Sequence, residues 1–329
     1  MMQAFTERRC WPDAKPVERM GRTRAVIDIG TNSVKLLVAD VDGNVVTRLF
    51  ENSEQTRLGQ GFYETSRLLP EAIEATARAV RQWTEKAALF SPERIEVVAT
   101  SVAREALNQA DLLSAVERES GQKVRVISGE TEAAWAYKGV TTNPALTAKN
   151  ILVLDVGGGS TEFIVGKGPT PLASHSFKLG TVRLLELFPP KDPPSAEDRH
   201  NVQSSIKALI ENEIASFLAP HLAALNGESV ILVGTGGTST LLARMALGTN
   251  DFDADALERV VLSRETLTKR NDELWRLPLV LRRMIRGLPA QRADVILMGS
   301  AIYAAVMSHF EIQEMRISTR GLRFAALLE

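Results

Sequence analysis

Residues 26–38 read VIDIGTNSVKLLV, and residues 153–165 read VLDVGGGSTEFIV. The two stretches align without a gap, and their apolar positions agree. Each reads as a strand with an acidic residue near its end, a turn of small residues, and a second strand. An internal repeat of this kind predicts two similar domains whose turns meet at one cleft. The repeated polar and glycine positions pair Asp28 with Asp155, Gly30 with Gly157, and Ser33 with Ser160.

Strand-like and helix-like patterns alternate around both copies, which predicts a layered α/β protein. The predicted strands are 25–29, 34–41, 45–50, 95–99 and 124–127, then 151–156, 162–165, 172–177, 230–233 and 315–317. The predicted helices are 69–80, 103–107, 111–119, 130–140, 182–187, 196–218 and 239–247, and helices dominate from there to the end.

The composition narrows the class of protein. The chain has 329 residues, of which 44% are hydrophobic and 24% charged, and its net charge is −1. This length suits two domains, and the balance excludes wholesale disorder, collagen and coiled coil. The near-zero net charge gives no global attraction to nucleic acid or membrane. The single cysteine, Cys10, excludes disulfide scaffolds and zinc fingers.

The N-terminal residues and the hydropathy of the chain indicate where in the cell the protein is expected. No apolar stretch reaches the ~20 residues of a membrane span. Residues 1–23 lack the apolar core of a signal peptide. We therefore expect a flexible N-terminal arm over 1–23 and a cytoplasmic protein that does not enter the membrane.

Three turns rich in glycine and hydroxyl residues each follow a predicted strand. They lie at 30–33, 157–161 and 234–239. Glycine lets the chain bend and lets an anion approach the backbone closely, and successive N–H groups form a concave anion site. The third turn precedes a helix, whose N-terminus favours phosphate. Three such turns predict a phosphate-binding cleft.

Acidic residues beside these turns predict a cation. The carboxylates of Asp28 and Asp155 would repel a phosphate unless Mg²⁺ lies between the carboxylates and the phosphate. Glu162, near the start of the strand that follows the second turn, could reach the same ion. Hydrolysis then needs a water activated by a carboxylate. The turn at 128–132 supplies Glu130 and Glu132, and the residue pattern does not choose between them.

The strand-to-helix junction at 99–104 offers a further anion-binding group. Arg104 could grip phosphate oxygens in a bidentate way. Ser101 at the same junction is equally suited to capping the helix.

Taken together, these motifs resemble the exopolyphosphatase / guanosine pentaphosphate phosphohydrolase (Ppx/GppA) family. The likeness runs from about Arg24 to the C-terminus. The motifs are DIGTNS at 28–33, ATSVAR at 99–104, SGETE at 128–132, DVGGGSTE at 155–162, LGTVR at 179–183, GTGGT at 234–238, GLP at 287–289, RADV at 292–295 and GLR at 321–323.

This resemblance implies an α/β, two-domain actin-like ATPase (ribonuclease H-like) fold with a central interdomain cleft. Domain I is expected over 24–138, completed by about 311–329, and domain II over 139–310. The implied activity is hydrolysis of the terminal phosphate of inorganic polyphosphate, with guanosine pentaphosphate as the alternative substrate. The implied cofactor is Mg²⁺ or Mn²⁺. Homodimers are common in the family, although no sequence stripe identifies an interface.

The family's functional positions carry over residue by residue. Glu132 would be the base that activates water, and Arg104 would hold or polarise the phosphoryl group. Asp155 and Glu162 would hold the metal, with Asp28 facing it from the other domain. The phosphate-binding positions would be Thr31, Asn32, Ser33, Gly157, Gly158, Gly159, Ser160, Thr161, Gly236, Gly237 and Thr238.

The sequence also departs from the family pattern. Lys35 replaces a histidine or arginine after the first turn, and Thr131 and Ala134 stand where many members have Glu and Arg. The chain ends soon after Arg323, so we expect the short form without the HD-like C-terminal domain.

The segment Arg264–Arg292 is strongly basic. It could be a track for a polyanion or a solvated helix face, with Trp275, Leu279, Val280 and Ile285 packing inward. No aromatic stacking platform accompanies it, so we do not expect a nucleic-acid partner.

Two rival functions remain open from the sequence. The first is phosphotransfer by an actin-fold kinase, which would phosphorylate an acceptor instead of releasing phosphate. The second is an alarmone sensor, which would bind guanosine tetraphosphate without turnover.

Overall fold

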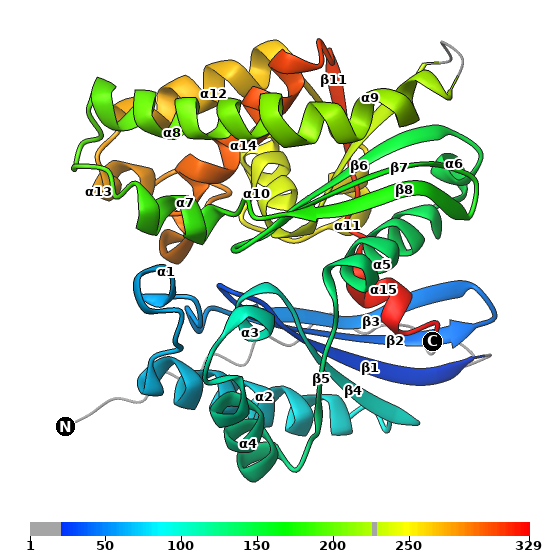
Figure 1. The fold of residues 1–329 in the computed structure, drawn as a ribbon. Helices are drawn as coiled ribbons and strands as arrows, with labels where there is room; N and C mark the ends of the chain where they lie inside the picture. The colour runs from blue at the N-terminus through cyan, green and yellow to red at the C-terminus, as the bar shows by residue number, and fades with distance from the viewer. Residues whose placement is uncertain (1–20, 226–228) are drawn as a thin grey trace.

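The first half of the chain forms a five-stranded sheet. The computed structural model describes residues 21–225 and 229–329, which form two α/β halves stacked face to face (Figure 1). The strands of the first half are β1 (Arg22–Ile29), β2 (Val34–Asp42), β3 (Val45–Glu54), β4 (Arg94–Ala99) and β5 (Val124–Val126), in the order β3-β2-β1-β4-β5. Residues 1–20 of the expected arm lie outside the described residues. The expected end of that arm at residue 23 is wrong, because β1 already begins at Arg22.

The second half repeats this topology. Its strands are β6 (Asn150–Val156), β7 (Thr161–Lys167), β8 (Thr170–Phe177), β9 (Ile231–Thr235), β10 (Val261–Ser263) and β11 (Glu314–Ile317), in the order β10-β11-β9-β6-β7-β8. In both halves three antiparallel strands follow one another, and the next strand pairs in parallel with the first. The predicted α/β, two-domain actin-like fold is therefore confirmed. Among the strands of residues 21–225 and 229–329, only the three-residue strand β10 has no counterpart among the predicted strands.

The internal repeat holds to the level of single hydrogen bonds. The Gly30 N–H donates to the Ser33 carbonyl at 3.0 Å, and the Gly157 N–H donates to the Ser160 carbonyl at 3.0 Å. The strand registers also match, because Asp28 lies opposite Lys35 and Asp155 lies opposite Glu162. Both turns therefore present their backbones in the same way.

Helices α2 (Pro70–Ala88) and α4 (Gln109–Ser120) pack side by side on the outer face of the first sheet (Figure 1). Pro70 starts α2, since a proline at the first helical position has no N–H to leave unpaired. The buried stripe of α2, including Ile73 and Val80, covers Ile27 and Val38 of the sheet. The short helices α1 (Phe62–Thr65) and α3 (Ser101–Glu105) also belong to this half.

The second sheet is covered mainly by long helices. The predicted helix over 196–218 runs as α8 (Ala196–Leu209), the π-turn η1 (Ile210–Ile214) and α9 (Ala215–Ala223). Ser195 and Asp198 form a capping box that fixes its start. The other elements are α6 (Pro144–Thr147), α7 (Thr181–Leu187), α10 (Gly236–Leu247), α11 (Ala254–Glu258), α12 (Arg264–Arg276), α13 (Leu279–Arg282), η2 (Ala290–Arg292) and α14 (Ile296–His309).

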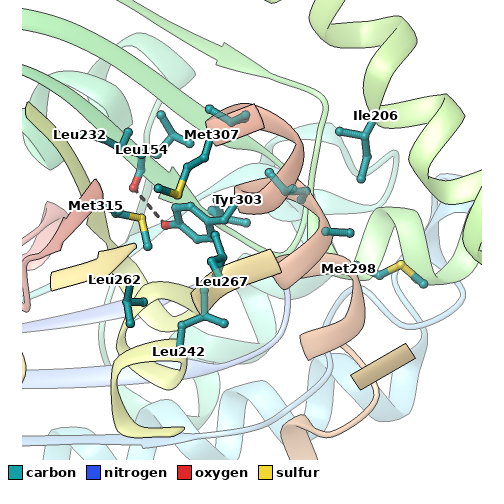
Figure 2. Close-up of a cluster of buried hydrophobic side chains, with 14 of the residues drawn as sticks. Leu154, Ile206, Leu232, Leu242, Leu262, Leu267, Met298, Tyr303, Met307 and Met315 are labelled. Atoms are coloured by element: carbon teal, nitrogen blue, oxygen red, sulfur yellow. Dashed lines mark hydrogen bonds between the residues drawn. The ribbon is translucent and has the colours of Figure 1, made fainter. Parts of the chain in front are cut away.

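The core of this half lies between the second sheet and α14. Figure 2 shows Leu154 and Leu232 of the sheet around Tyr303 and Met307 of α14. The Tyr303 hydroxyl donates to the Leu154 carbonyl at 3.3 Å, so this fully buried phenol keeps a hydrogen-bond partner. The core thus fixes β6, whose C-terminal end carries Asp155.

The basic segment Arg264–Arg292 buries most of the apolar residues that its sequence pattern predicts to pack inward, with one exception. Trp275 is buried, and Leu279 and Ile285 are half-buried against the core. Val280 was expected to pack inward and is 61% exposed instead. It lies in the four-residue helix α13, which is too short to bury a full stripe.

Two helices connect the halves. Helix α5 (Gly129–Thr141) and helix α15 (Leu322–Ala326) pack against each other between the two sheets (Figure 1). Helix α5 contacts β6, β7 and β8 of the second sheet, so the expected boundary at residue 138 falls inside an element shared by both halves. The expected return of 311–329 to domain I is only partly right. β11 pairs with β9 and β10 in the second sheet, and α15 alone contacts β1.

The close crossing of α5 and α15 depends on Gly139. A Cβ on Gly139 would lie 2.0 Å from the Gly321 carbonyl oxygen, which is a backbone atom that cannot rotate away. We expect Gly139→Ala to lower the free energy of unfolding by about 1–3 kcal/mol through overpacking. Thermal unfolding measures this, with Ala134→Ser on the half-exposed side of the same helix as control. Equal melting temperatures for the two variants would contradict the close approach.

Candidate functional site

The turns at 30–33 and 157–160 and the start of α10 converge on one narrow cavity between the two halves. The cavity is walled by backbone from both halves, and the turns touch directly. A Cβ on Gly159 would lie 2.3 Å from Ser101 Oγ and 3.0 Å from Thr31 Oγ1. Most of the predicted site residues line this cavity, namely Asp28, Thr31, Asn32, Ser33, Glu132, Asp155, Gly157, Gly158, Gly159, Ser160, Glu162, Gly237 and Thr238.

Three predicted site residues lie elsewhere. Thr161 is fully buried, and its hydroxyl donates to the Leu179 carbonyl at 2.5 Å, so it holds the hairpin and does not face a ligand. Gly236 lines a larger adjoining cavity. Arg104 is absent from both linings, because its guanidinium donates to the Ile127 carbonyl at 2.8 Å and to Glu132 Oε2 at 3.2 Å. Arg104 therefore contacts the candidate base Glu132 directly, and its grip on phosphate stays a prediction.

Gly236 owes its identity to two constraints. Its φ of 79° lies in the left-handed region that favours glycine, and a Cβ there would lie 2.1 Å from Asp155 Oδ1. The helix α10 begins at Gly236, three residues earlier than the predicted start at 239. Gly236 and Gly237 of the third turn thus lie in the first turn of a helix, whose unpaired N–H groups suit an anion.

The two candidate bases of the 128–132 turn are separated by the structure. Glu132 lines the cavity, and its side chain is only 12% exposed. Glu130 is exposed, and a hydrogen bond to its own backbone N–H and one from Ser128 lower its pKa. Ser128 caps α5 by accepting from the Thr131 N–H at 3.2 Å. At the junction before α3, the N-cap is Thr100, and Ser101 makes no cap.

Several acids share the cavity, and their charges oppose one another. Burial raises the pKa of Glu132 well above its usual value, and the neighbouring Glu162 raises it further, while Arg104 lowers it. Burial and Asp155 raise the pKa of Glu162 to about 7. Burial likewise raises the pKa of Asp155, against the lowering effect of Lys35. A cation placed near these acids would favour their ionised forms.

The acids fit a magnesium ion that takes most of its ligands from elsewhere. Asp28 Oδ1 is buried without a hydrogen-bond partner among the described residues. Glu162 Oε1 is already engaged, since Ser160 Oγ and Ser176 Oγ donate to it at 2.8 and 2.7 Å. In residues 21–225 and 229–329 no three acidic, histidine or cysteine side chains converge as a complete metal site. The expected trio of Asp28, Asp155 and Glu162 is therefore not one ligand cluster, whereas Mg²⁺ held by one or two carboxylates and by phosphate oxygens fits Asp28 and Asp155.

Two cations of the cavity were not among the predicted site residues. Lys35 Nζ lies 3.8 Å from Asp28 Oδ2, and Arg292 Nη2 donates to Ser33 Oγ at 2.7 Å. Both line the narrow cavity and the adjoining one. Burial lowers the pKa of Arg292 to about 10, which leaves it charged at neutral pH. The repeat itself could have identified Lys35, because it occupies the position of Glu162 in the other copy.

The adjoining cavity is larger, about 250 Å³, and continues from the first. The two share Asp28, Lys35, Asp155, Gly237 and Arg292 in their walls. Its remaining wall mixes apolar and polar side chains, among them Leu241, Arg244, Phe252 and Phe324. The cleft therefore has room for more than a single phosphate group.

No helix in the described parts of the chain is long and apolar enough to cross a membrane.

The model of the Ppx/GppA phosphatase family matches residues 37–329. "Exopolyphosphatase 2" of Mycobacterium tuberculosis is 32% identical over 296 residues, which cover 86% of this chain and 89% of that protein. "Guanosine-5'-triphosphate,3'-diphosphate pyrophosphatase" of Vibrio atlanticus is 31% identical and is matched over 91% of this chain but 57% of its own length.

The fold is similar to solved structures as well. The Ppx/GppA family member of Aquifex aeolicus superimposes with a TM-score of 0.74 at 30% identity, covering 93% of this chain and 96% of that one. The family model begins after the first turn at 30–33 and spans the second and third turns and the connecting helices α5 and α15. The chain belongs to the Ppx/GppA phosphatase family.

Proposed function

We propose that this protein hydrolyses the terminal phosphoanhydride bond of inorganic polyphosphate. The observation that carries the proposal is Glu132, a largely buried carboxylate in a cavity walled by three anion-binding turns. The names of the mycobacterial and Haemophilus influenzae relatives, "Exopolyphosphatase 2" and "Putative exopolyphosphatase", support it.

The reaction assigns a role to each wall of the cavity. The backbone of the turns at 30–33 and 157–160 and the start of α10 would bind the terminal phosphate oxygens, and Arg292 and Lys35 would offset their charge. Glu132, oriented by Arg104, would accept the proton of the attacking water. The water oxygen bonds to the terminal phosphorus as the bridging P–O bond breaks, giving inorganic phosphate and a shorter chain.

Asp28 and Asp155 are the residues that would hold Mg²⁺ or Mn²⁺. When bound, the ion would neutralise phosphate charge and stabilise the ionised acids. Asp28 and Asp155 come from equivalent positions of the two repeats, so a cation between them also favours docking of the two halves.

Guanosine pentaphosphate is the second candidate substrate. The observation that favours it is the adjoining cavity of about 250 Å³, whose apolar wall could accept a nucleoside while its phosphates reach Glu132. The name of the Vibrio atlanticus relative points the same way.

Phosphate release tests the proposal directly. Purified protein with Mg²⁺ is incubated in parallel with long-chain polyphosphate, tripolyphosphate, guanosine pentaphosphate and ATP. Release from polyphosphate supports the first candidate, and preferential release from guanosine pentaphosphate supports the second. Phosphorylation of ADP or a sugar would instead indicate phosphotransfer, and tight guanosine tetraphosphate binding without turnover would indicate a sensor.

Location and assembly stay predictions. We propose a cytoplasmic protein that forms homodimers and does not bind nucleic acid. Cell fractionation, sedimentation and a filter-binding assay with RNA and DNA test these three points.

Arg292 gives a sharp test of the anion site. We expect Arg292→Gln to raise KM and to lower kcat/KM by about 100-fold, because a charge-assisted bond to phosphate in a shielded cleft is lost. The matched control is Arg286→Gln, an exposed arginine of the same basic segment. Steady-state kinetics on polyphosphate measures both variants, and equal losses would place the anion site elsewhere.

A further inference from the structure

The N-terminus of α7 holds the carbonyl oxygens of the second phosphate turn. Every carbonyl from 157 to 159 accepts a hydrogen bond from the start of this helix. Three of the donors are backbone N–H groups, and the fourth is the side chain of Arg183. The bonds are Thr181 N–H to Gly157 O at 3.0 Å, Val182 N–H to Gly158 O at 2.8 Å, Arg183 N–H to Gly158 O at 3.1 Å, and Arg183 Nε to Gly159 O at 2.8 Å.

These bonds determine where the N–H groups of the turn point. A trans peptide is planar, so the N–H of each residue is directed opposite to the preceding carbonyl. With their carbonyls turned to α7, the N–H groups of Gly158, Gly159 and Ser160 point away from it. Within residues 21–225 and 229–329 none of these three groups donates a backbone hydrogen bond, and all three residues line the narrow cavity. Helix α7 therefore orients donors that are free for phosphate.

Arg183 also reaches the first half of the chain. Its Nη2 lies 2.8 and 3.0 Å from the two carboxylate oxygens of Glu105, at the end of α3. Its guanidinium stacks on the ring of Tyr63 at 4.4 Å from the centroid. One side chain thus bonds the phosphate turn of one half and an acid of the other.

Glu186, three residues later on α7, makes a second contact across the cleft. Its carboxylate accepts from the Gly61 N–H at 2.6 Å and from the Tyr63 N–H at 3.2 Å, at the start of α1. Figure 1 shows α7 directly facing α1 across the gap between the halves. We call Arg183 and Glu186 the α7 clasp.

We propose that Arg183 is a positioning residue for the reaction, which couples the orientation of the phosphate turn to docking of the two halves. This inference rests on the proposed phosphatase function. With the halves docked, Glu105 and Tyr63 fix the guanidinium, and its Nε holds the Gly159 carbonyl so that the Ser160 N–H faces the cavity. With the halves apart, Arg183 loses Glu105 and Tyr63 and the turn loses one anchor. Glu186 strengthens docking without touching the turn.

The two roles predict different kinetic effects. Arg183→Gln removes both the turn anchor and the ion pair, so we expect kcat/KM to fall about 10- to 100-fold with a clear loss in kcat. Glu105→Gln and Glu186→Gln leave the Arg183–Gly159 bond in place, so we expect mainly a higher KM. Arg183→Lys keeps the charge but not the fork of donors, and should recover only part of the rate.

The matched control is Arg199→Gln. Arg199 pairs with Asp272, and both residues lie in the second half on α8 and α12. An ion pair that only stabilises the fold would lower the melting temperature and the active fraction in the same way as this control, without changing KM. The double variant Arg183→Gln/Glu105→Gln should be no worse than Arg183→Gln alone, because the two residues act as one unit.

Small-angle X-ray scattering tests the clasp independently of turnover. In the presence of tripolyphosphate and Mg²⁺, we expect Glu186→Gln and Arg183→Gln to have a larger radius of gyration than the wild type and Arg199→Gln. Unchanged radii together with unchanged kcat/KM in all clasp variants would overturn the inference. If the wild type releases no phosphate from any substrate, the proposed function fails, and the scattering comparison still supports or overturns the clasp.

Discussion

Glu132→Gln is expected to fold normally and to lose almost all phosphate release. A general base contributes about 10²–10⁴-fold to the rate, and Gln cannot accept the proton of the attacking water. The substitution also removes one charge from a buried cluster of acids, so KM for polyphosphate should not rise. Initial rates with saturating Mg²⁺ measure kcat, and circular dichroism confirms the fold.

The neighbouring Glu130 supplies the control for this experiment. Glu130→Gln makes the same chemical change two residues away, at an exposed position outside the cavity. It should keep nearly the full rate. A Glu132→Gln protein with wild-type kcat would remove Glu132 from the role of base. A loss of the same size in both variants would point to damage at the start of α5 instead.

Asp155→Asn is expected to raise the Mg²⁺ concentration needed for half-maximal activity at least about 10-fold, on the scale of losses seen when metal-site residues are changed. The carboxylate oxygen at the end of β6 is a hard donor that Mg²⁺ prefers, and the amide that replaces it is neutral. Burial and Asp28 raise the pKa of Asp155, so its charge is costly in the metal-free protein. The variant should therefore melt no lower than the wild type when Mg²⁺ is absent.

Titrating activity against Mg²⁺ and against Mn²⁺ measures the first effect, and thermal unfolding with EDTA measures the second. Asp111→Asn on the exposed start of α4 is the control for loss of one acid. An unchanged Mg²⁺ requirement in Asp155→Asn would take Asp155 out of the metal site and leave Asp28 as its candidate ligand.

Local patterns were sufficient for most elements of the fold. The strands over 25–29 and 151–156 are short apolar runs interrupted only by Asp28 and Asp155, and a short run rich in β-branched residues is typical of a buried strand. The gapless repeat predicted the paired topology, and the identical hydrogen bonds of the turns at Gly30 and Gly157 bear this out. The wrong predictions concern elements that are short or segments that contribute to both halves. Val280 lies in a four-residue helix, and β11 joins the second sheet although α15, a few residues later, joins the first half.

The candidate site could be predicted in part for the same reason. Turn residues such as Ser33, Gly157 and Ser160 act through their own backbone, so an anion site made by them can be predicted from the residues of the turn. Local patterns could not indicate the contacts of Arg104 and Thr161, because each bonds a partner distant in the chain, Glu132 and Leu179 respectively. Arg292 was missed because its guanidinium meets Ser33, which no local pattern could indicate.

The sequence by itself determined the α/β class, the repeat, the three phosphate turns and the family, because each follows from residues close together in the chain. The family resemblance had already assigned the base to Glu132, and the structure agrees, because Glu132 and not Glu130 lines the cavity. Only the tertiary structure decided that Arg292 and Lys35 supply the positive charge of the cavity and that Arg183 joins the two halves. The physical reason is that burial, charge neighbours and hydrogen-bond partners are properties of the assembled cleft, which forms only when the two halves dock.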